Sequence, residues 1–156
     1  MRSALARILK DHEQRRNAEI SAREAEQAGL EKFLADATTA LTTVVAPCFD
    51  WFSEELKRHN HTCTIEVQEQ DPGDKRSEVK IMLTIFPDHT TLPQGNPALS
   101  YTASAHRLKV NAHRSITTRS GGLIPASIGD YELAQITPAL VDRHLLEWAE
   151  TIFAQA

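Results

Sequence analysis

Cysteine is scarce in this chain, and long apolar runs are absent. The 156 residues include only Cys48 and Cys63, too few for the disulfide framework of small secreted domains. No apolar stretch approaches the roughly 20 residues that a membrane-spanning helix needs. Acidic residues near the start also argue against a targeting peptide. We therefore expect a cytoplasmic protein with no membrane segment.

Sequence motifs for catalysis are missing as well. No serine lies in a nucleophile elbow, and no glycine-rich loop opens a helix to hold phosphates. Cys48 follows a proline in an apolar segment, a position typical of packing rather than of an activated thiol. We expect no cofactor. Because residues distant in sequence can still form a site, an enzyme stays open as the less favoured class.

What is present is the composition of an ordinary globular domain. Apolar residues make up 41% of the chain and charged residues 24%, with a formal net charge of −4. This balance excludes wholesale disorder, and it gives no overall attraction to nucleic acid or to an anionic membrane. Any affinity for anions would have to come from a local patch.

The hydrophobic pattern predicts an α+β fold that begins with helices. Residues 2–28 have a helix-favouring composition but few large aliphatic side chains. From Leu30 to about His59 apolar residues recur at helical spacing, with Pro47 in the middle. A proline removes one hydrogen bond and crowds the preceding turn, so we expect a kink or two abutting helices. We divide the chain into a projecting helical arm, residues 1–29, and one α+β domain, residues 30–156.

Strand patterns fill the middle of the chain. Apolar and polar residues alternate over residues 63–68, 78–85, 99–105 and 106–119, and one strand or two short ones would cover 124–136. QDPGDKRS, residues 70–77, is typical of a turn. Thr137 and Pro138 suit the start of a closing helix. With no helix between the strands, we predict a four- or five-stranded antiparallel meander, covered on its apolar face by the kinked helix and the C-terminal helix.

The arm carries two features of its own. One is a ladder of alternating charge at a spacing of four residues, formed by Asp11, Arg15, Glu19 and Arg23. The other is a line of small residues that would allow a second helix to approach closely, formed by Ala18, Ala22 and Ala25. A solvated, partly frayed tail is the simpler interpretation. The alternative is an arm about 40 Å long that pairs with a second copy, and we predict a homodimer of this kind.

The stretch HRLKVNAHRSITTRSGG, residues 106–122, holds four basic residues, two histidines and no acid. In a strand its odd positions would face away from the helices, and they include Arg107, Lys109, Asn111, His113 and Arg119. Acids on neighbouring strands would neutralise this row in the ordinary case. The alternative is a surface that binds a protein partner or an anion. The row contains no aromatic residue for base stacking, so we do not expect nucleic acid as its partner.

Three metal-binding residue types follow one another at a spacing of two, namely His59, His61 and Cys63. A structural zinc site takes four ligands, usually in closely spaced pairs. The fourth ligand and the paired spacing are absent, so we predict no metal site.

Taken together, these patterns favour a non-enzymatic protein-interaction module, of an adaptor or chaperone-like kind, that associates with itself. The competing hypothesis is anion or nucleic-acid binding through the basic strand 106–119, with Arg114 added to Arg107, Lys109 and Arg119 as the cations.

Overall fold

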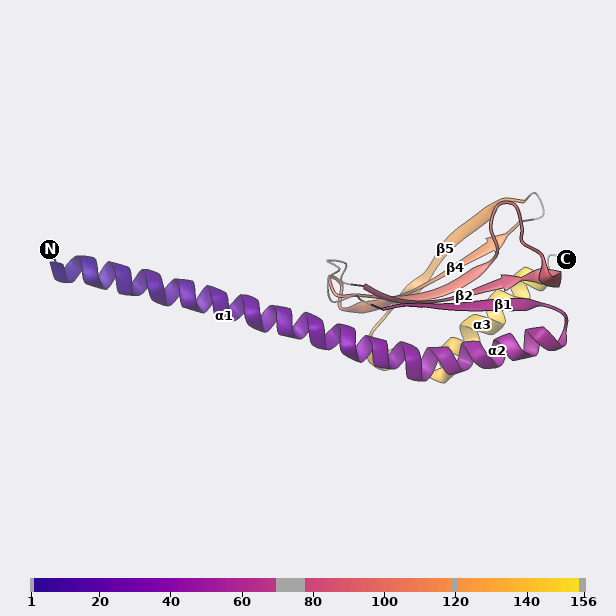
Figure 1. Ribbon diagram of the computed structural model, residues 1–156, viewed down its shortest axis with the longest axis horizontal. Helices are drawn as coiled ribbons and strands as arrows, with labels where there is room; N and C mark the ends of the chain where they lie inside the picture. Colours follow the sequence, from indigo (N-terminus) through magenta and orange to yellow (C-terminus); the bar gives the residue numbers. More distant parts are fainter. Residues whose placement is uncertain (1, 70–77, 119–120, 155–156) are drawn as a thin grey trace.

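The computed structural model describes residues 2–69, 78–118 and 121–154, and its fold is α+β, as predicted (Figure 1). The helices are α1 (Arg2–Ala40), α2 (Ala46–Arg58) and α3 (Pro138–Phe153). The strands are β1 (Thr62–Gln68), β2 (Glu78–Phe86), β3 (Ala98–Ser104), β4 (Lys109–Thr117) and β5 (Leu123–Tyr131). They form one antiparallel sheet in the order β1-β2-β3-β4-β5. The predicted meander is therefore confirmed with five strands.

The two predicted N-terminal helices are one helix that does not stop at Gly29. α1 runs into a π-helical turn over Leu41–Val45, and α2 follows directly. In this turn the N–H of Ala46 donates to the carbonyl of Leu41, five residues earlier. A proline ring crowds the carbonyl four residues before it, and the wider turn lies just ahead of Pro47. The helical backbone thus forms a π turn just before Pro47 and continues past it, instead of ending there.

β5 is a single strand, where the sequence had left one strand or two open. Its pairing with β4 passes from Ala112 opposite Gly129 to His113 opposite Ser127, so Ile128 is an extra residue. Such a bulge increases the local twist of a sheet, and β4 and β5 rise away from the helical layer in Figure 1. The turn predicted over residues 70–77 lies outside the described residues.

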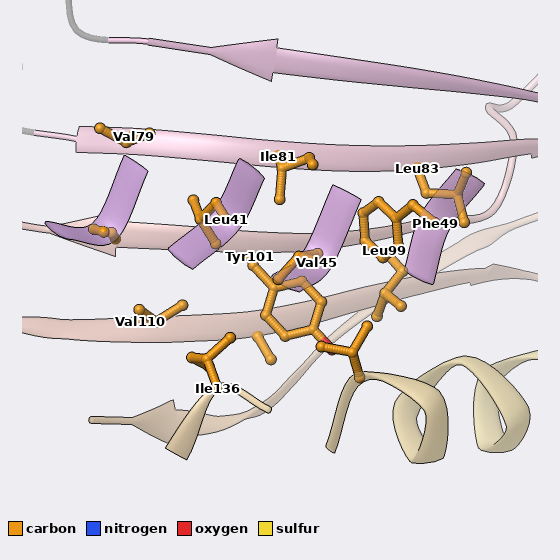
Figure 2. Close-up of a cluster of buried hydrophobic side chains, with 14 of the residues drawn as sticks. Leu41, Val45, Phe49, Val79, Ile81, Leu83, Leu99, Tyr101, Val110 and Ile136 are labelled. Carbon is orange, nitrogen blue, oxygen red and sulfur yellow. The ribbon is translucent and has the colours of Figure 1, made fainter. Parts of the chain in front are cut away.

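The core lies between one face of the sheet and the helices, and Figure 2 shows its centre. The helix contributes a stripe of buried side chains: Leu34, Ala37, Leu41, Val45, Phe49 and Phe52. The sheet contributes alternate residues of β2 and β3, among them Ile81, Leu83, Leu99 and Tyr101. From α3, Trp148 packs against Phe52 with ring centroids 6.0 Å apart. The prediction that both the second helix and the last helix cover the same sheet face is confirmed.

Three side-chain hydrogen bonds attach α3 to the sheet. His144 is buried, with its Nδ1 2.7 Å from the Tyr101 hydroxyl and its Nε2 3.0 Å from the Tyr131 hydroxyl. The indole N–H of Trp148 donates to the carbonyl of Ser115 at 3.1 Å. At the start of the helix, the Thr137 hydroxyl accepts from the N–H of Leu140 at 3.3 Å, which is the predicted cap.

Among the described residues, none of the helices combines the length and the apolar character needed to cross a lipid bilayer.

Candidate functional site

The open face of the sheet, opposite the helices, is polar and is ordered in rows by the strand register. Short hydroxyl side chains of β3 run down its middle: Ser100, Thr102 and Ser104. Lys80 of β2 lies beside Thr102, and Asn111 of β4 lies on the other side of Thr102. In the next row Ser104 stands between Glu78 and Lys109. A column of small side chains is therefore flanked by longer ones.

This difference in side-chain length leaves a hollow of about 450 Å³ on the open face. We call it the sheet hollow; its lining residues are Glu78, Lys80, Ser100, Thr102, Ser104, Arg107, Lys109, Asn111, His113 and Asp130. The volume falls within the range of about 300–1,000 Å³ that is usual for small-molecule sites. Three lysine or arginine side chains and two carboxylates line it, so it is locally positive on a chain of net charge −4.

The structure brings together most of the basic row predicted from sequence. Arg107, Lys109, Asn111 and His113 all line the sheet hollow, whereas Arg119 lies outside the described residues. Arg114, the further cation of the competing hypothesis, is not among the lining residues. It pairs with Leu99, a core residue, and paired residues of neighbouring strands share one face of the sheet. The strand alternation thus separates Arg114 from the other cations.

Acids on β5 and just beyond it do lie near two of these cations, but at long range. A guanidinium nitrogen of Arg107 is 3.8 Å from a carboxylate oxygen of Asp130, and Nζ of Lys109 is 3.9 Å from Glu132. The shorter contact to Asp130 comes from the side-chain amide of Asn111, at 2.9 Å. Exposed ion pairs contribute only about 0–1 kcal/mol. The cations are therefore loosely held and can turn toward another anion.

Sequence reasoning missed Lys80. This half-buried side chain has no ion pair with any described residue, and it is the hollow's cation on the β2 side. The alternation of β2 places Lys80 on the polar face of the sheet, and that signal was readable. Only the register shows that Lys80 lies across Thr102 from Asn111 of β4, on the opposite wall of the same hollow.

The hydroxyls on the floor of the hollow are unoccupied by protein partners. Within the described part of the chain, no hydrogen bond is made by the side chains of Ser100, Thr102 or Ser104. Each hydroxyl can donate one hydrogen bond and accept two. With Lys80 and His113, which are likewise without a partner among the described residues, they form a set of donors that faces one space.

Two residues of the zinc-like spacing, His61 and Cys63, make other contacts. Nδ1 of His61 accepts the N–H of Asp88 at 3.0 Å, and its ring lies 5.0 Å from that of Phe153. Cys63 packs at the edge of the core, where burial raises its pKa to about 11. Across residues 2–69, 78–118 and 121–154, no three His, Cys, Asp or Glu side chains are grouped so that they could hold a metal ion.

Neither thiol is activated for nucleophilic chemistry. Burial, followed by the nearby carboxylate of Asp142, raises the pKa of Cys48. With the pKa of Cys63 also raised, both side chains are neutral at physiological pH, and it is the thiolate that acts as a nucleophile.

The predicted arm residues lie on an uncovered helix. Every residue from 2 to 29 is exposed, including the ladder charges and the small-residue line. The ladder does not neutralise itself: among the described residues, no ion pair involves Asp11, Arg15, Glu19 or Arg23. In Figure 1 this part of α1 projects away from the domain.

A second hollow, of about 420 Å³, lies where the helix leaves the domain. Its lining residues are Glu26, Gly29, Leu30, Ala105, His106 and Leu108. Leu108 is 49% exposed and has a φ of 54°, unusual for a bulky residue. We call this place the root hollow.

No protein-family model, no curated protein and no solved structure matches this chain significantly.

Proposed function

We propose that this protein is a non-enzymatic interaction module that associates with itself through residues 2–29 of α1. The observation that carries the proposal is the complete exposure of this helical segment. Helices in water gain most of their stability from packing rather than from intrinsic propensity. A segment that packs on nothing within its own chain, yet carries an ordered pattern of charge, suits a partner helix.

The charge ladder selects one arrangement of two arms. If the arms run antiparallel and cross at Asn17, Arg15 lies opposite Glu19 of the second copy, and Asp11 lies opposite Arg23 of the second copy. Two-fold symmetry repeats both pairs, so four opposite-charge pairs form from one sequence. A self-complementary patch of this kind is what a two-fold dimer requires.

The same register covers apolar residues that are otherwise exposed. Leu5 and Ile8 have 57% and 63% of their surface exposed. In the antiparallel register, Leu5 of the second copy lies opposite Gly29, and Ile8 of the second copy lies opposite Glu26. Both of these positions line the root hollow, so the apolar end of one arm would reach the apolar base of the other.

Exposed apolar side chains on the helical layer support an adaptor role toward a further protein. Trp51 is 58% exposed and Leu146 is 63% exposed. The carboxylate of Asp142 on α3 lies near the thiol of Cys48 on α2. Trp51 and Leu146 each lie about one turn further along these helices. Tryptophan is enriched in protein interfaces.

Removal of residues 2–28 tests the proposal. We expect the full chain to be a dimer and the shortened chain a folded monomer, as measured by multi-angle light scattering and circular dichroism. The deletion takes away no buried side chain, since Leu34 is the first one along the chain. A full chain that is monomeric at micromolar concentration would show the proposal to be wrong.

Charge exchange tests the register. Glu19→Arg sets like charges opposite each other at two places in the antiparallel dimer, and we expect about tenfold weaker association, since 1.4 kcal/mol corresponds to a factor of ten. The double variant Arg15→Glu/Glu19→Arg restores both pairs and should restore the affinity. Glu24→Arg, an equally exposed change on another side of the helix, is the control. Failure of the double variant to recover would contradict this register.

A further inference from the structure

We infer that the sheet hollow is a binding site for a small phosphate ester that also carries hydroxyl groups, as sugar phosphates do. This site is independent of the arm, because its lining residues all belong to β2, β3, β4, β5 and the turn before β4.

The cations of the hollow stand on two sides of its floor. Lys80 stands on the β2 wall, while Lys109 and Arg107 stand on the β4 side, and the hydroxyls of β3 lie between them. A phosphate group accepts hydrogen bonds through several oxygens that point in different directions, and bonds to ionised donors are the strong ones. Donors that come from the floor and from both walls match this geometry.

The remaining acceptors indicate what the rest of the ligand contains. Glu78 lines the hollow and forms no ion pair with a described residue. A carboxylate is an acceptor only, so it would repel a second phosphate and accept hydrogen bonds from hydroxyl groups. Asp130 on the other edge adds a second carboxylate. Cations that would bind a phosphate, beside carboxylates that would accept from hydroxyl groups, together describe a phosphorylated polyol.

The lining also excludes a base-containing ligand as the preferred one. None of the ten lining residues is a phenylalanine, tyrosine or tryptophan, whereas proteins that bind single-stranded nucleic acid stack the bases on aromatic side chains. Among the described residues of the lining, the imidazole of His113 is the one aromatic ring. The hollow therefore suits a small polar molecule better than a nucleotide chain.

Glucose 6-phosphate serves as the probe, in a titration of the full-length chain at low salt followed by ¹H–¹⁵N nuclear magnetic resonance. We expect saturable shifts of the amides around Lys80, Thr102 and Lys109, and no comparable shifts with glucose. Citrate is the carboxylate arm: if citrate binds in the hollow and glucose 6-phosphate does not, the phosphate assignment is wrong. An absence of saturable shifts at the hollow with glucose 6-phosphate overturns the inference.

Two variants locate the binding. Lys80→Gln should weaken the apparent affinity about tenfold, since it removes a charged donor. Thr102→Val keeps the shape but removes a floor hydroxyl, and should weaken it by a smaller factor. The matched controls are Lys57→Gln and Thr64→Val, exposed positions outside the hollow. Equal losses in variants and controls would contradict the site, and circular dichroism verifies that each variant is folded.

Discussion

One continuous helical stretch runs through two environments in this protein, and its two halves differ in what they face. Residues 2–29 are all exposed, whereas residues 30–58 contain the buried stripe from Leu34 to Phe52. Both halves are helical throughout the described residues. Helical backbone therefore does not distinguish the two halves, and the apolar stripe decides which half belongs to the domain.

The spacing of the buried stripe also explains the π turn. The buried residues from Ala37 to Phe49 are spaced by four residues in three successive steps. In a regular α-helix of 3.6 residues per turn, steps of four drift around the axis. A π turn contains more residues per turn, so the turn at Leu41–Val45 keeps the stripe directed at the sheet. The π turn therefore does two things: it accommodates Pro47, and it keeps the buried residues directed at the sheet.

The largest effect that separates the two halves is expected from Phe49→Ala. Phe49 is fully buried and its ring lies 6.0 Å from that of Tyr101. Truncation of a buried phenylalanine costs about 3–5 kcal/mol, and urea denaturation should show a loss of this size in the free energy of unfolding. Ile20→Ala in the arm should change it by less than about 0.5 kcal/mol at concentrations where the chain is monomeric. Equal losses of stability in Phe49→Ala and Ile20→Ala would contradict the claim that only the second half of the helix belongs to the domain.

A smaller effect is expected from the polar part of the core. Tyr101→Phe removes the hydroxyl that lies 2.7 Å from His144. A buried imidazole nitrogen without its partner costs about 1–3 kcal/mol. The free energy of unfolding should fall by this amount, as measured by urea denaturation. His12→Gln replaces an exposed histidine of the arm. It is the control and should leave the free energy of unfolding unchanged.

The same histidine makes the stability of the domain depend on pH. Burial first, and the charge of Arg143 second, lower the pKa of His144 below its ordinary value of 6.5, while Glu147 acts in the opposite direction. The unfolded chain therefore binds a proton that the folded chain does not. Stability from this group is complete above pH 6.5 and falls as the pH drops through the lowered pKa. Thermal melts between pH 7 and pH 5 should show a steeper decline for the natural chain than for His144→Phe.

The smallest effect is expected from loss of the arm. Deletion of residues 2–28 removes only exposed side chains, so the free energy of unfolding of the monomeric domain should change by less than about 0.5 kcal/mol. Guanidinium denaturation of the full and the shortened chain, at protein concentrations where both are monomeric, measures this difference. A loss of several kcal/mol would mean that the arm packs on its own domain.

The sequence predicted the fold better than the site. Period-two alternation in β2, β3 and β4, and helical spacing from Leu30 onward, are local signals, and the structure confirms the elements they predict. The π turn at Leu41–Val45 was not readable, because a proline fits a kink and a break equally. His144 was missed entirely: its two tyrosine partners are 43 and 13 residues away.

The sequence by itself determined the classes of element, the apolar and polar faces of each, and the absence of local catalytic motifs. Those properties depend on neighbours within a few residues, where periodicity fixes which side chains share a face. The tertiary structure alone decided that Lys80 stands across a column of hydroxyls from the polar residues of β4, Asn111 and Lys109. The register brings together residues that are distant in the chain, and the alternation within one strand does not record which residue of the next strand lies opposite.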